Sequence, residues 1–344
     1  MKAPALFLSC DWGTTSFRLR LVSLAERRVV GQLTEPAGVK TINARIPETE
    51  RDSQAAREAA FAGFLRARVE QLCRGQAVSE SDLPLVISGM ASSTVGWREA
   101  PYATTPFPLD GSALRHVELR LDTAAGALPV YLLSGLSTGA DIMRGEESEV
   151  LGLMALPEAR AVAGESIVIL PGTHSKHVFV RHGAITDFRT YMTGELLEVL
   201  ATQSLLKVSV QWPLPSMRPV LDTGTSAERA AFLAGVEMVR ERGLAASLFR
   251  VRARSVLDRV PATENGWFLS GLLIGAELLD LVSPATDVPL VLAATEPHRT
   301  PYELALTHLG AGNRLVKIPE PTIGQATVLA HARFVERLAT HSQT

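Results

Sequence analysis

Residues 6–22, LFLSCDWGTTSFRLRLV, predict two strands joined by a short polar loop. An apolar-rich run over residues 6–10 leads into the loop 11–15, and residues 17–22 then alternate between apolar side chains and arginines. Alternation with a period of two is typical of a strand with one buried face. The stretch therefore predicts a β-hairpin on a buried sheet, with residues 11–15 at its tip.

The hairpin tip carries groups that suit a phosphate ligand. Gly13 allows a ligand to approach the backbone closely, and Thr14 and Thr15 supply hydroxyls beside backbone N–H groups. Asp11 is an oxygen ligand of the kind that Mg²⁺ accepts, usually through water. An ordinary β-turn containing glycine explains the same residues, so the rest of the chain must decide between the two interpretations.

Composition limits the classes of protein that the chain can represent. With 344 residues, 46% of them hydrophobic, it has enough material for about two domains. Its 34 basic and 36 acidic residues give no indication of nucleic-acid or membrane-surface binding. The most apolar later stretch, 268–282, is interrupted by Glu277 and Asp280 and is too short to span a bilayer. Cys10 and Cys73, both expected to be buried thiols, suit a reducing cytoplasm.

The hairpin pattern returns about half a chain later. Residues 167–191 predict a strand, a polar loop PGTHSK (171–176) and two further strands. Two such hairpins, each followed by helical segments, predict a duplicated α/β architecture with a phosphate loop in each half. Lys176 does not stand in a P-loop frame, and His174 and His177 lack the further ligands that a zinc site needs.

A long segment of small and polar residues, 88–102, follows a buried strand predicted at 83–87. Long irregular segments in compact domains usually serve a site. Trp97, Arg98 and Glu99 could stack on and hydrogen-bond a small polar substrate. A surface loop with one tryptophan packed on the body is the alternative.

Acidic residues gather after a strand predicted at 129–134. Asp141 and Arg144 precede a predicted helix whose first turn holds Glu146 and Glu147. The helix dipole alone favours acids in that turn. Their position directly after a buried strand is also where α/β sheets bind ligands.

The last third of the chain predicts alternating strands and helices. Helices are expected to begin near residues 225, 300 and 322, and strands to lie at 267–269, 289–293 and 315–318. Gly271 follows the first of these strands, where a strand-to-helix turn could admit a flat nucleotide ring. A glycine required for close packing is the alternative.

Several of these segments resemble known kinases. Asp11–Arg18 resembles the phosphate-1 motif of glycerol kinase and its relatives in the actin and sugar-kinase superfamily, and Gly172-Thr173 occupies the place of their second phosphate motif. The segments SGMASSTVGWREAPY, GADIMRGEESEVLGL, LPGTHSKHVFV and TYMTGELLEVL resemble the 2-dehydro-3-deoxygalactonokinase family, and the likeness covers most of the chain.

The resemblance implies an α/β fold of two ribonuclease-H-like (actin-like ATPase) domains with a cleft between them. Residues 1–134 would carry the phosphate-1 and sugar-binding loops, and residues 135–344 the phosphate-2 loop and the adenosine site, with the helix 323–341 packing back on the first domain. The implied reaction uses ATP and Mg²⁺ to phosphorylate the 6-hydroxyl of 2-dehydro-3-deoxy-D-galactonate in galactonate catabolism. The expected partner is a small sugar acid, not nucleic acid or a membrane; a homodimer is left open.

The resemblance also implies roles for individual residues. ATP would be bound by Asp11, Gly13, Thr14, Thr15, Arg18, Gly172, Thr173, His174, Ser175 and Gly271, with Asp11 holding Mg²⁺ through water. The substrate would contact Ser92, Trp97, Arg98, Glu99 and Arg144, with Arg98 or Arg144 pairing with its carboxylate. Related kinases commonly use aspartate as the base; the aligned residue here is Glu146, so Glu146 and Asp141 both stay open, with Glu147 third.

Three alternatives are kept. The protein could phosphorylate another sugar or sugar acid, or it could hydrolyse a polyphosphate or nucleotide as other members of the superfamily do. The third is an actin-like nucleotide-dependent scaffold, which predicts filaments and no phosphorylated acceptor.

Overall fold

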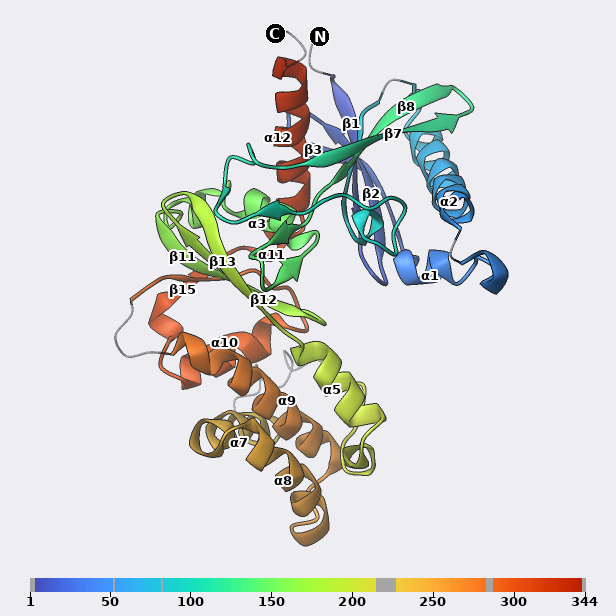
Figure 1. The fold of residues 1–344 in the computed structure, drawn as a ribbon. Coiled ribbons are helices and arrows are strands. Elements are labelled where there is room, and N and C mark those ends of the chain that lie inside the picture. Colours follow the sequence, from blue (N-terminus) through green and yellow to red (C-terminus); the bar gives the residue numbers. More distant parts are fainter. Residues whose placement is uncertain (1–3, 52, 82, 215–226, 283–286, 342–344) are drawn as a thin grey trace. The chain divides into compact units, whose positions relative to one another are not determined.

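The computed structural model describes residues 4–51, 53–81, 83–214, 227–282 and 287–341 (Figure 1). The chain forms two compact units. Unit 1 comprises the residues up to Ala163, the short segment Arg181–Asp187 and the residues from Gly324 onward. Unit 2 comprises Gly164–Val180 and Phe188–Ile323. Each unit is described by itself.

Unit 1 is built on a six-stranded sheet. Its order is β3 (Arg28–Glu35), β2 (Phe17–Ser23), β1 (Leu6–Trp12), β4 (Leu85–Gly89), β8 (Gly126–Leu133) and β7 (His116–Thr123). The strands β1 to β3 are antiparallel, whereas β4 is parallel to β1 and β8 is parallel to β4. The predicted first hairpin is confirmed, with Trp12 opposite Phe17 at its end.

Helices cover the two faces of this sheet. The helix α2 (Gln54–Gly75) packs on the face that carries Leu8, Cys10 and Trp12, where Phe61 joins the same buried cluster. Ser9, which points to the opposite face because strand side chains alternate, contacts His331 of α12 (Ala326–His341). Both cysteines are buried and unpaired, as predicted.

Unit 2 repeats this topology. Its sheet runs β15 (Leu315–Lys317), β14 (Leu290–Leu292), β11 (Glu165–Leu170), β12 (Ser175–Arg181) and β13 (Ala184–Tyr191). β14 is parallel to both β11 and β15. The four residues between β11 and β12 are too few for a parallel crossover, so this pair is antiparallel. The predicted α/β fold with a duplicated hairpin is thus confirmed.

The tip of the β12–β13 hairpin belongs to unit 1. There Ala184 and Ile185 pair with β6 (Phe107–Pro108). A small separate sheet in unit 1 contains β5 (Ala103–Thr104), β9 (Leu136–Ser137) and β10 (Ile142–Met143). The short helical segments elsewhere in the chain are α1 (Val39–Asn43), α4 (Pro157–Arg160), α11 (Glu320–Ile323), η1 (Glu48–Glu50), η2 (Met90–Ser92), η3 (Leu205–Val208), η4 (Leu279–Leu281) and η5 (Gly312–Arg314).

The first unit extends further along the chain than the boundary expected at residue 134. Residues 135–163, including α3 (Glu146–Leu153), belong to unit 1. The reason is the packing of α3 on α12, in which Gly152 lies so close to Ala326 that an added Cβ would be 1.7 Å from the Ala326 carbonyl oxygen. This contact joins residues far apart in the sequence, which no local pattern reveals.

Unit 2 also contains a group of helices: α5 (Thr193–Thr202), α7 (Ala227–Arg242), α8 (Leu244–Leu257), α9 (Ala262–Leu278) and α10 (Arg299–His308). The strand predicted at 267–269 is wrong, because these residues lie inside α9. Their apolar run is that of a helix buried on all sides, and a short apolar run does not distinguish this from a buried strand. The residues predicted to cap α7 near 225 lie outside the described part of the chain.

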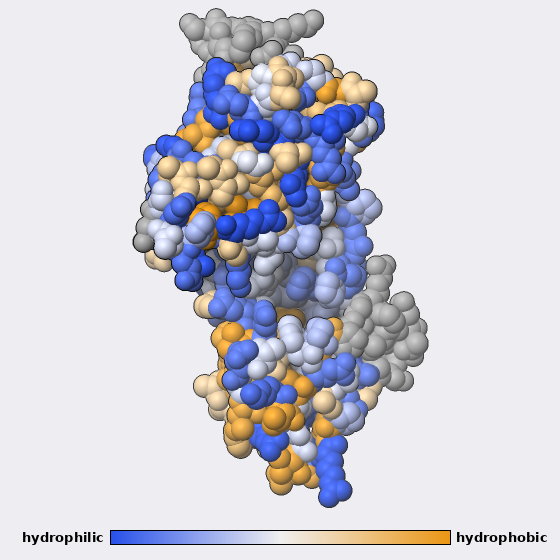
Figure 2. All heavy atoms as spheres, turned by 90° about the vertical axis from the view of Figure 1, so that its right-hand side faces the viewer, coloured by the Kyte–Doolittle hydropathy of each residue, from blue (hydrophilic) through white to orange (hydrophobic). Residues whose placement is uncertain are grey.

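No helix within the described ranges is both long and apolar enough to cross a membrane. Figure 2 shows apolar side chains at the end of unit 2 that carries α7 and α8. Exposed large apolar residues on η3 and α8 are Leu205, Val208, Phe249, Val256 and Leu257.

Candidate functional site

The loop at the tip of the first hairpin presents unpaired backbone donors. Gly13 closes the turn by donating its N–H to the Ser16 carbonyl at 2.9 Å. The N–H groups of residues 38–40 donate to the carbonyls of residues 13–15 at 3.0 to 3.1 Å, so these carbonyls point away from the exposed side. Within the described residues, the N–H groups of Thr14 and Thr15 have no acceptor, and both residues are exposed. Such a turn is a ready anion-binding concavity.

Gly38 makes this arrangement possible. A Cβ added to Gly38 would lie 2.3 Å from the backbone of Thr14 and Thr15. Real Cβ atoms do not come that close to backbone atoms, so only glycine allows the start of α1 to support the loop from behind.

Asp11 stands at the carboxyl end of β1, directly before this loop. Its Oδ2 accepts from Arg18 Nη1 at 3.1 Å, and the side chain is 26% exposed. Burial raises the pKa of Asp11 and Glu146 raises it further, against the effects of Arg18 and Arg20. Asp11 is therefore electrostatically coupled to the acidic start of α3.

Two glycines bring α3 to the end of β1. Gly89, at the end of β4, has φ +97°, and a Cβ there would lie 2.6 Å from the Trp12 carbonyl oxygen. Gly145, before α3, has φ +109°, and a Cβ there would lie 3.1 Å from the Gly89 Cα. The ends of β1 and β4 and the start of α3 thus pack backbone against backbone, a geometry that only glycine allows at these positions.

The acids of α3 differ in their partners. Glu146 Oε2 accepts the Arg144 N–H at 2.9 Å, and Glu147 Oε2 accepts the Gly145 N–H at 2.8 Å. The Glu147 side chain is buried and also accepts from the Ser148 hydroxyl at 3.1 Å. Glu147 is therefore committed to the helix start, whereas Glu146 is partly accessible.

Glu149 is a residue of this cluster that the sequence reasoning missed. Burial raises its pKa to about 8, with Asp11 and Glu146 adding to the effect. The signal was present in the sequence, because residues three apart on a helix share a face and Glu149 follows Glu146 by three. The structure thus gathers Asp11, Glu146 and Glu149.

The two raised pKa values predict how stability changes with pH. The pKa of Glu147 is about 7 and that of Glu149 about 8, both raised first by burial from an ordinary value of 4.5. Between pH 4.5 and these raised pKa values, the folded chain binds more protons than the unfolded chain. The stability that the two protonated acids contribute is therefore complete below pH 4.5 and is lost as the pH rises to about 8. At about 1.4 kcal/mol per pKa unit, shifts of this size correspond to a loss of several kcal/mol.

Urea unfolding at pH 5, 6.5 and 8 measures this loss. Glu149→Gln should make the unfolding free energy depend less on pH than in the wild type. An unchanged pH slope in the variant would contradict the assignment.

The alternative base, Asp141, makes contacts within its own turn. It belongs to the turn between β9 and β10, where its Oδ1 accepts the Ile142 N–H at 2.7 Å and its carbonyl accepts the Thr138 N–H at 3.0 Å. Glu146, and not Asp141, is the acid of this segment that shifts the pKa of Asp11.

The loop 88–102 differs from its predicted role in one respect. Trp97 is 3% exposed and belongs to the core of unit 1, so its ring offers no face on which a substrate could stack. The alternative interpretation, a tryptophan packed on the body, was the correct one. Arg98 and Glu99 are exposed, and the Arg98 guanidinium pairs with Glu58 of α2.

Arg144 is buried and holds this loop in place. Its Nη1 donates to the Ser92 hydroxyl at 3.0 Å and also to the Ser92 carbonyl, and Nη2 donates to the Ala100 carbonyl at 3.2 Å. The guanidinium lies 4.2 Å from the ring centroid of Tyr102. Ser92 is itself buried and donates its hydroxyl to the Gly89 carbonyl. Arg144 and Ser92 therefore bond to each other and hold the loop 88–102 in its conformation.

The second loop, between β11 and β12, also presents free donors. Within the described residues, the N–H groups of Thr173 and His174 have no acceptor, and both residues are exposed. The start of α5 packs against this loop at Gly194, where a Cβ would lie 2.6 Å from the Gly172 carbonyl oxygen. Gly194 is not among the residues predicted from the sequence to belong to the site.

Two predicted phosphate ligands of this loop have other partners. The Ser175 side chain is buried and bonds to the Tyr302 hydroxyl at 3.0 Å and to the Gly172 N–H at 3.3 Å. It therefore shapes the loop from behind. The His174 ring pairs with Glu195 at 2.5 Å, which holds it at the exposed side.

A cavity of about 320 Å³ opens beside this loop in unit 2. It lies at the carboxyl ends of the parallel strands β11 and β14, where α/β sheets bind ligands. Its lining includes Gly172, Thr173, Trp212, Trp267, Pro297 and His298. Flat rings and prolines beside a loop with free N–H groups suit an aromatic base carrying phosphates.

Gly271 does not line this cavity. It lies within α9, where a Cβ would be 2.0 Å from the Phe232 carbonyl oxygen of α7. The strand-to-helix turn predicted at Gly271 is wrong: the residue is a helix-packing glycine, and its neighbour Ser270 lines the cavity.

No group of three or more His, Cys, Asp or Glu side chains among the described residues could hold a metal ion directly. Mg²⁺ in general keeps several waters and binds through one or two carboxylates and the phosphates of its substrate. The partly exposed Asp11 carboxylate beside the first loop is suited to such water-mediated binding.

Comparison with known proteins agrees with these features. A profile of the family described as 2-keto-3-deoxy-galactonokinase matches residues 11–327. The chain is 33% identical over 340 residues to the 2-dehydro-3-deoxygalactonokinase of Escherichia coli (strain K12), covering 95% of this chain and 98% of the relative. It is 32% identical over 351 residues to a protein of Rhizobium meliloti (strain 1021) named as a probable 2-dehydro-3-deoxygalactonokinase, covering 96% and 99%.

A solved structure is similar as well. The crystal structure of a proposed 2-dehydro-3-deoxygalactonokinase from Sinorhizobium meliloti superposes with a TM-score of 0.76 at 28% identity, covering 96% of this chain and 99% of that one. The profile match and the relatives extend over nearly the whole sequence. The chain therefore belongs to the 2-keto-3-deoxy-galactonokinase family.

Proposed function

We propose that the protein transfers the γ-phosphoryl group of ATP to the 6-hydroxyl of 2-dehydro-3-deoxy-D-galactonate, a step of galactonate catabolism. As a member of a kinase family it uses ATP. The observation that carries the proposal is the repetition of one device: in each unit, a loop with free N–H groups follows the first strand of the sheet. One loop stands beside an acidic helix start and the other beside a cavity lined by flat rings.

We assign roles accordingly. The cavity of unit 2 takes the adenosine, and the N–H groups of Thr173 and His174 take phosphate oxygens. The loop of Gly13, Thr14 and Thr15 takes the phosphates nearest the transfer, with Arg18 as a cation beside them. Mg²⁺, held through water by Asp11, would neutralise phosphate charge.

The base is proposed to be Glu146. Its carboxylate would take the proton from the sugar hydroxyl as that oxygen bonds to the γ-phosphorus, and the bond from phosphorus to the β,γ-bridging oxygen breaks to release ADP. Phosphoryl transfer needs mainly alignment and charge neutralisation from the protein. Glu147 is less suited, because its carboxylate is buried and bonded to the helix start.

Arg98 is the proposed partner of the substrate carboxylate. The Arg98 side chain is 44% exposed and pairs with the carboxylate of Glu58. The Nη atoms of Arg144, by contrast, already donate hydrogen bonds to Ser92 and Ala100. An exposed arginine can exchange a surface partner for a substrate carboxylate and bind it through two parallel hydrogen bonds.

Arg98→Gln should raise the KM for the sugar acid about tenfold, the value of one charge-assisted hydrogen bond, and leave the KM for ATP unchanged. Glu58→Gln is the matched control: it removes the same ion pair but keeps the cation, so its KM for the sugar acid should not rise. Equal KM values for the sugar acid in Arg98→Gln and the wild type would reject this role.

A coupled ADP-release assay tests the function itself. A panel of 2-keto-3-deoxy sugar acids and neutral sugars should give turnover with the galactonate derivative and little with neutral sugars. Activity only with neutral sugars would refute the substrate class. Phosphate release from ATP without an acceptor, at the rate seen with the best sugar, would support hydrolysis instead.

Location and assembly are further proposals. We propose a cytoplasmic enzyme, because ATP is available there and two buried unpaired cysteines suit a reducing compartment. We propose that a homodimer, if it forms, covers the exposed apolar residues of η3 and α8, such as Val208 and Phe249. Light scattering on the wild type and on Phe249→Ser would test this.

A further inference from the structure

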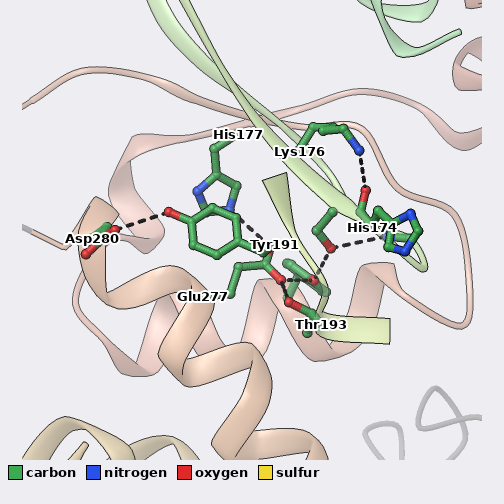
Figure 3. Close-up of polar contacts among 10 residues, drawn as sticks. His174, Lys176, His177, Tyr191, Thr193, Glu277 and Asp280 are labelled. Carbon is green, nitrogen blue, oxygen red and sulfur yellow. Dashed lines mark hydrogen bonds and ion pairs between the residues drawn. The ribbon is translucent and has the colours of Figure 1, made fainter. Parts of the chain in front are cut away.

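A buried carboxylate, Glu277 of α9, joins three elements beneath the cavity of unit 2 (Figure 3). The Glu277 residue is 2% exposed. Its Oε1 accepts from His177 Nε2 of β12 at 3.1 Å, and its Oε2 accepts from the Tyr302 hydroxyl of α10 at 2.8 Å and from the Thr193 hydroxyl of α5. Thr193 and Tyr302 both line the cavity.

These bonds form a chain with a fixed direction. Tyr302 gives its only hydroxyl proton to Glu277, so the bond of 3.0 Å between Tyr302 and Ser175 must be donated by Ser175. Ser175 Oγ in turn accepts the Gly172 N–H at 3.3 Å. The sequence of donors therefore runs from Gly172 through Ser175 and Tyr302 to Glu277.

The direction of these hydrogen bonds determines which N–H groups of the phosphate loop remain free. Because the Gly172 N–H points back to Ser175, the loop is anchored from behind at one end. At its other end, Glu195 of α5 donates its N–H to the Thr173 carbonyl at 3.1 Å. The N–H groups of Thr173 and His174 are left without an acceptor in the described residues, and Thr193, next to Gly194, fixes the start of α5 through Glu277.

We propose that Glu277 is a positioning residue for the nucleotide phosphates: as the common acceptor for α5, α10 and β12, it holds the loop Gly172–His174 in the conformation that presents its free N–H groups. This inference rests on the proposed nucleotide site. Burial and the nearby Glu277 also raise the pKa of Tyr302 well above its usual value, which keeps the hydroxyl a donor. The carboxylate itself does not contact the ligand.

Glu277→Gln tests the inference with the shape of the side chain kept. An amide brings two hydrogens to a place surrounded by donors, so at least one of His177, Thr193 and Tyr302 loses its acceptor and the chain to Gly172 can reverse. We expect the Kd for ADP to rise about tenfold or more, as for one lost buried hydrogen bond. The Kd for adenosine, which has no phosphate, should change less than about threefold.

Isothermal titration calorimetry measures both Kd values. Their ratio distinguishes a displaced phosphate loop, which weakens only ADP binding, from a general loss of structure, which weakens the binding of both ligands. Ser175→Ala interrupts the same chain at a side chain that does not line the cavity, so it should weaken ADP binding in the same selective way. Adding it to Glu277→Gln should cost little more, because both interrupt one chain. Asp280→Asn is the matched control: this acid lies three residues after Glu277, but it is exposed, and its partners are Arg189 and the Tyr191 hydroxyl, neither of which bonds to Glu277. It should bind both ligands as the wild type does.

The outcomes are distinct. A wild type that does not bind ADP would refute the proposed function, whatever the variants do. A wild type that binds ADP, with Glu277→Gln binding ADP equally well or losing ADP and adenosine equally, would overturn the positioning role. If Glu277→Gln does not fold, Ser175→Ala decides the question by the same ratio, because Ser175 belongs to the chain but does not line the cavity.

Discussion

Glu146→Gln is expected to lower kcat by about 10²- to 10⁴-fold, the range found when a general base is removed. Glu146 is the partly accessible acid at the start of α3 and is coupled to Asp11 beside the first phosphate loop. Glutamine keeps the size of the side chain and can still accept from the Arg144 N–H, but it cannot take a proton from the sugar hydroxyl. The KM for ATP should change little, because the assigned nucleotide contacts lie on other residues.

Two other acids provide the controls for this experiment. Asp141→Asn should retain nearly wild-type kcat, since Asp141 belongs to the turn between β9 and β10. Glu149→Gln should reduce kcat less than Glu146→Gln and should shift its pH dependence, because it removes a neighbouring acid that couples to both Asp11 and Glu146. A large loss in Asp141→Asn together with an active Glu146→Gln would transfer the role of base to Asp141.

The parts of the fold that the sequence predicted are those with strong local patterns. The hairpin of residues 6–22 has alternating side chains and a glycine turn, and the one at 167–191 repeats that pattern, so both were found with shifts of up to three residues. The helix α2 has the same kind of local signal, because its buried residues Phe61, Leu65, Val69 and Leu72 recur at helical spacing. The repeated strand order of the two sheets follows from these pieces, and the duplication was therefore predictable.

The errors concern residues whose surroundings are set by distant segments. Trp97 looks like a binding residue in an irregular loop, and only the packed core shows that it is buried. Gly271 lies in an apolar run too short to identify as helix or strand, and its role depends on Phe232 of α7. In both cases a structural role and a functional role fit the local sequence equally well, and no local feature distinguishes them.

The candidate site shows the same division. The two loops could be located from their sequences, since glycine, threonine and aspartate after a strand are local signals. The sequence does not reveal the close packing of Gly89 and Gly145, which brings Glu146 to Asp11. This packing depends on the register of β4 beside β1. Glu277 was noticed only as a charge that interrupts an apolar run, and its three partners come from 84 to 100 positions before it and from 25 positions after it.

Asp11→Asn is the second change with a large expected effect, a loss of about 10²- to 10³-fold in kcat/KM, similar to removing one preorganised charge-stabilising group. Asparagine keeps the shape but loses the charge that would hold the water shell of Mg²⁺. Binding of ADP gives a readout that does not depend on turnover. In the wild type, Mg²⁺ should tighten ADP binding, and in Asp11→Asn it should have little effect.

Arg18→Gln separates the metal role of Asp11 from its ion pair. Arg18 is the cation 3.1 Å from Asp11, so a variant of either residue breaks the same contact. If the effect of Asp11→Asn came only from releasing Arg18, then Arg18→Gln would also abolish the response to Mg²⁺. We expect instead that Arg18→Gln weakens ADP binding with and without Mg²⁺ to the same degree, because it removes a phosphate-binding cation but leaves the carboxylate. A response to Mg²⁺ that persists in Asp11→Asn would show that another acid of the cluster, Glu146 or Glu149, holds the ion's water shell.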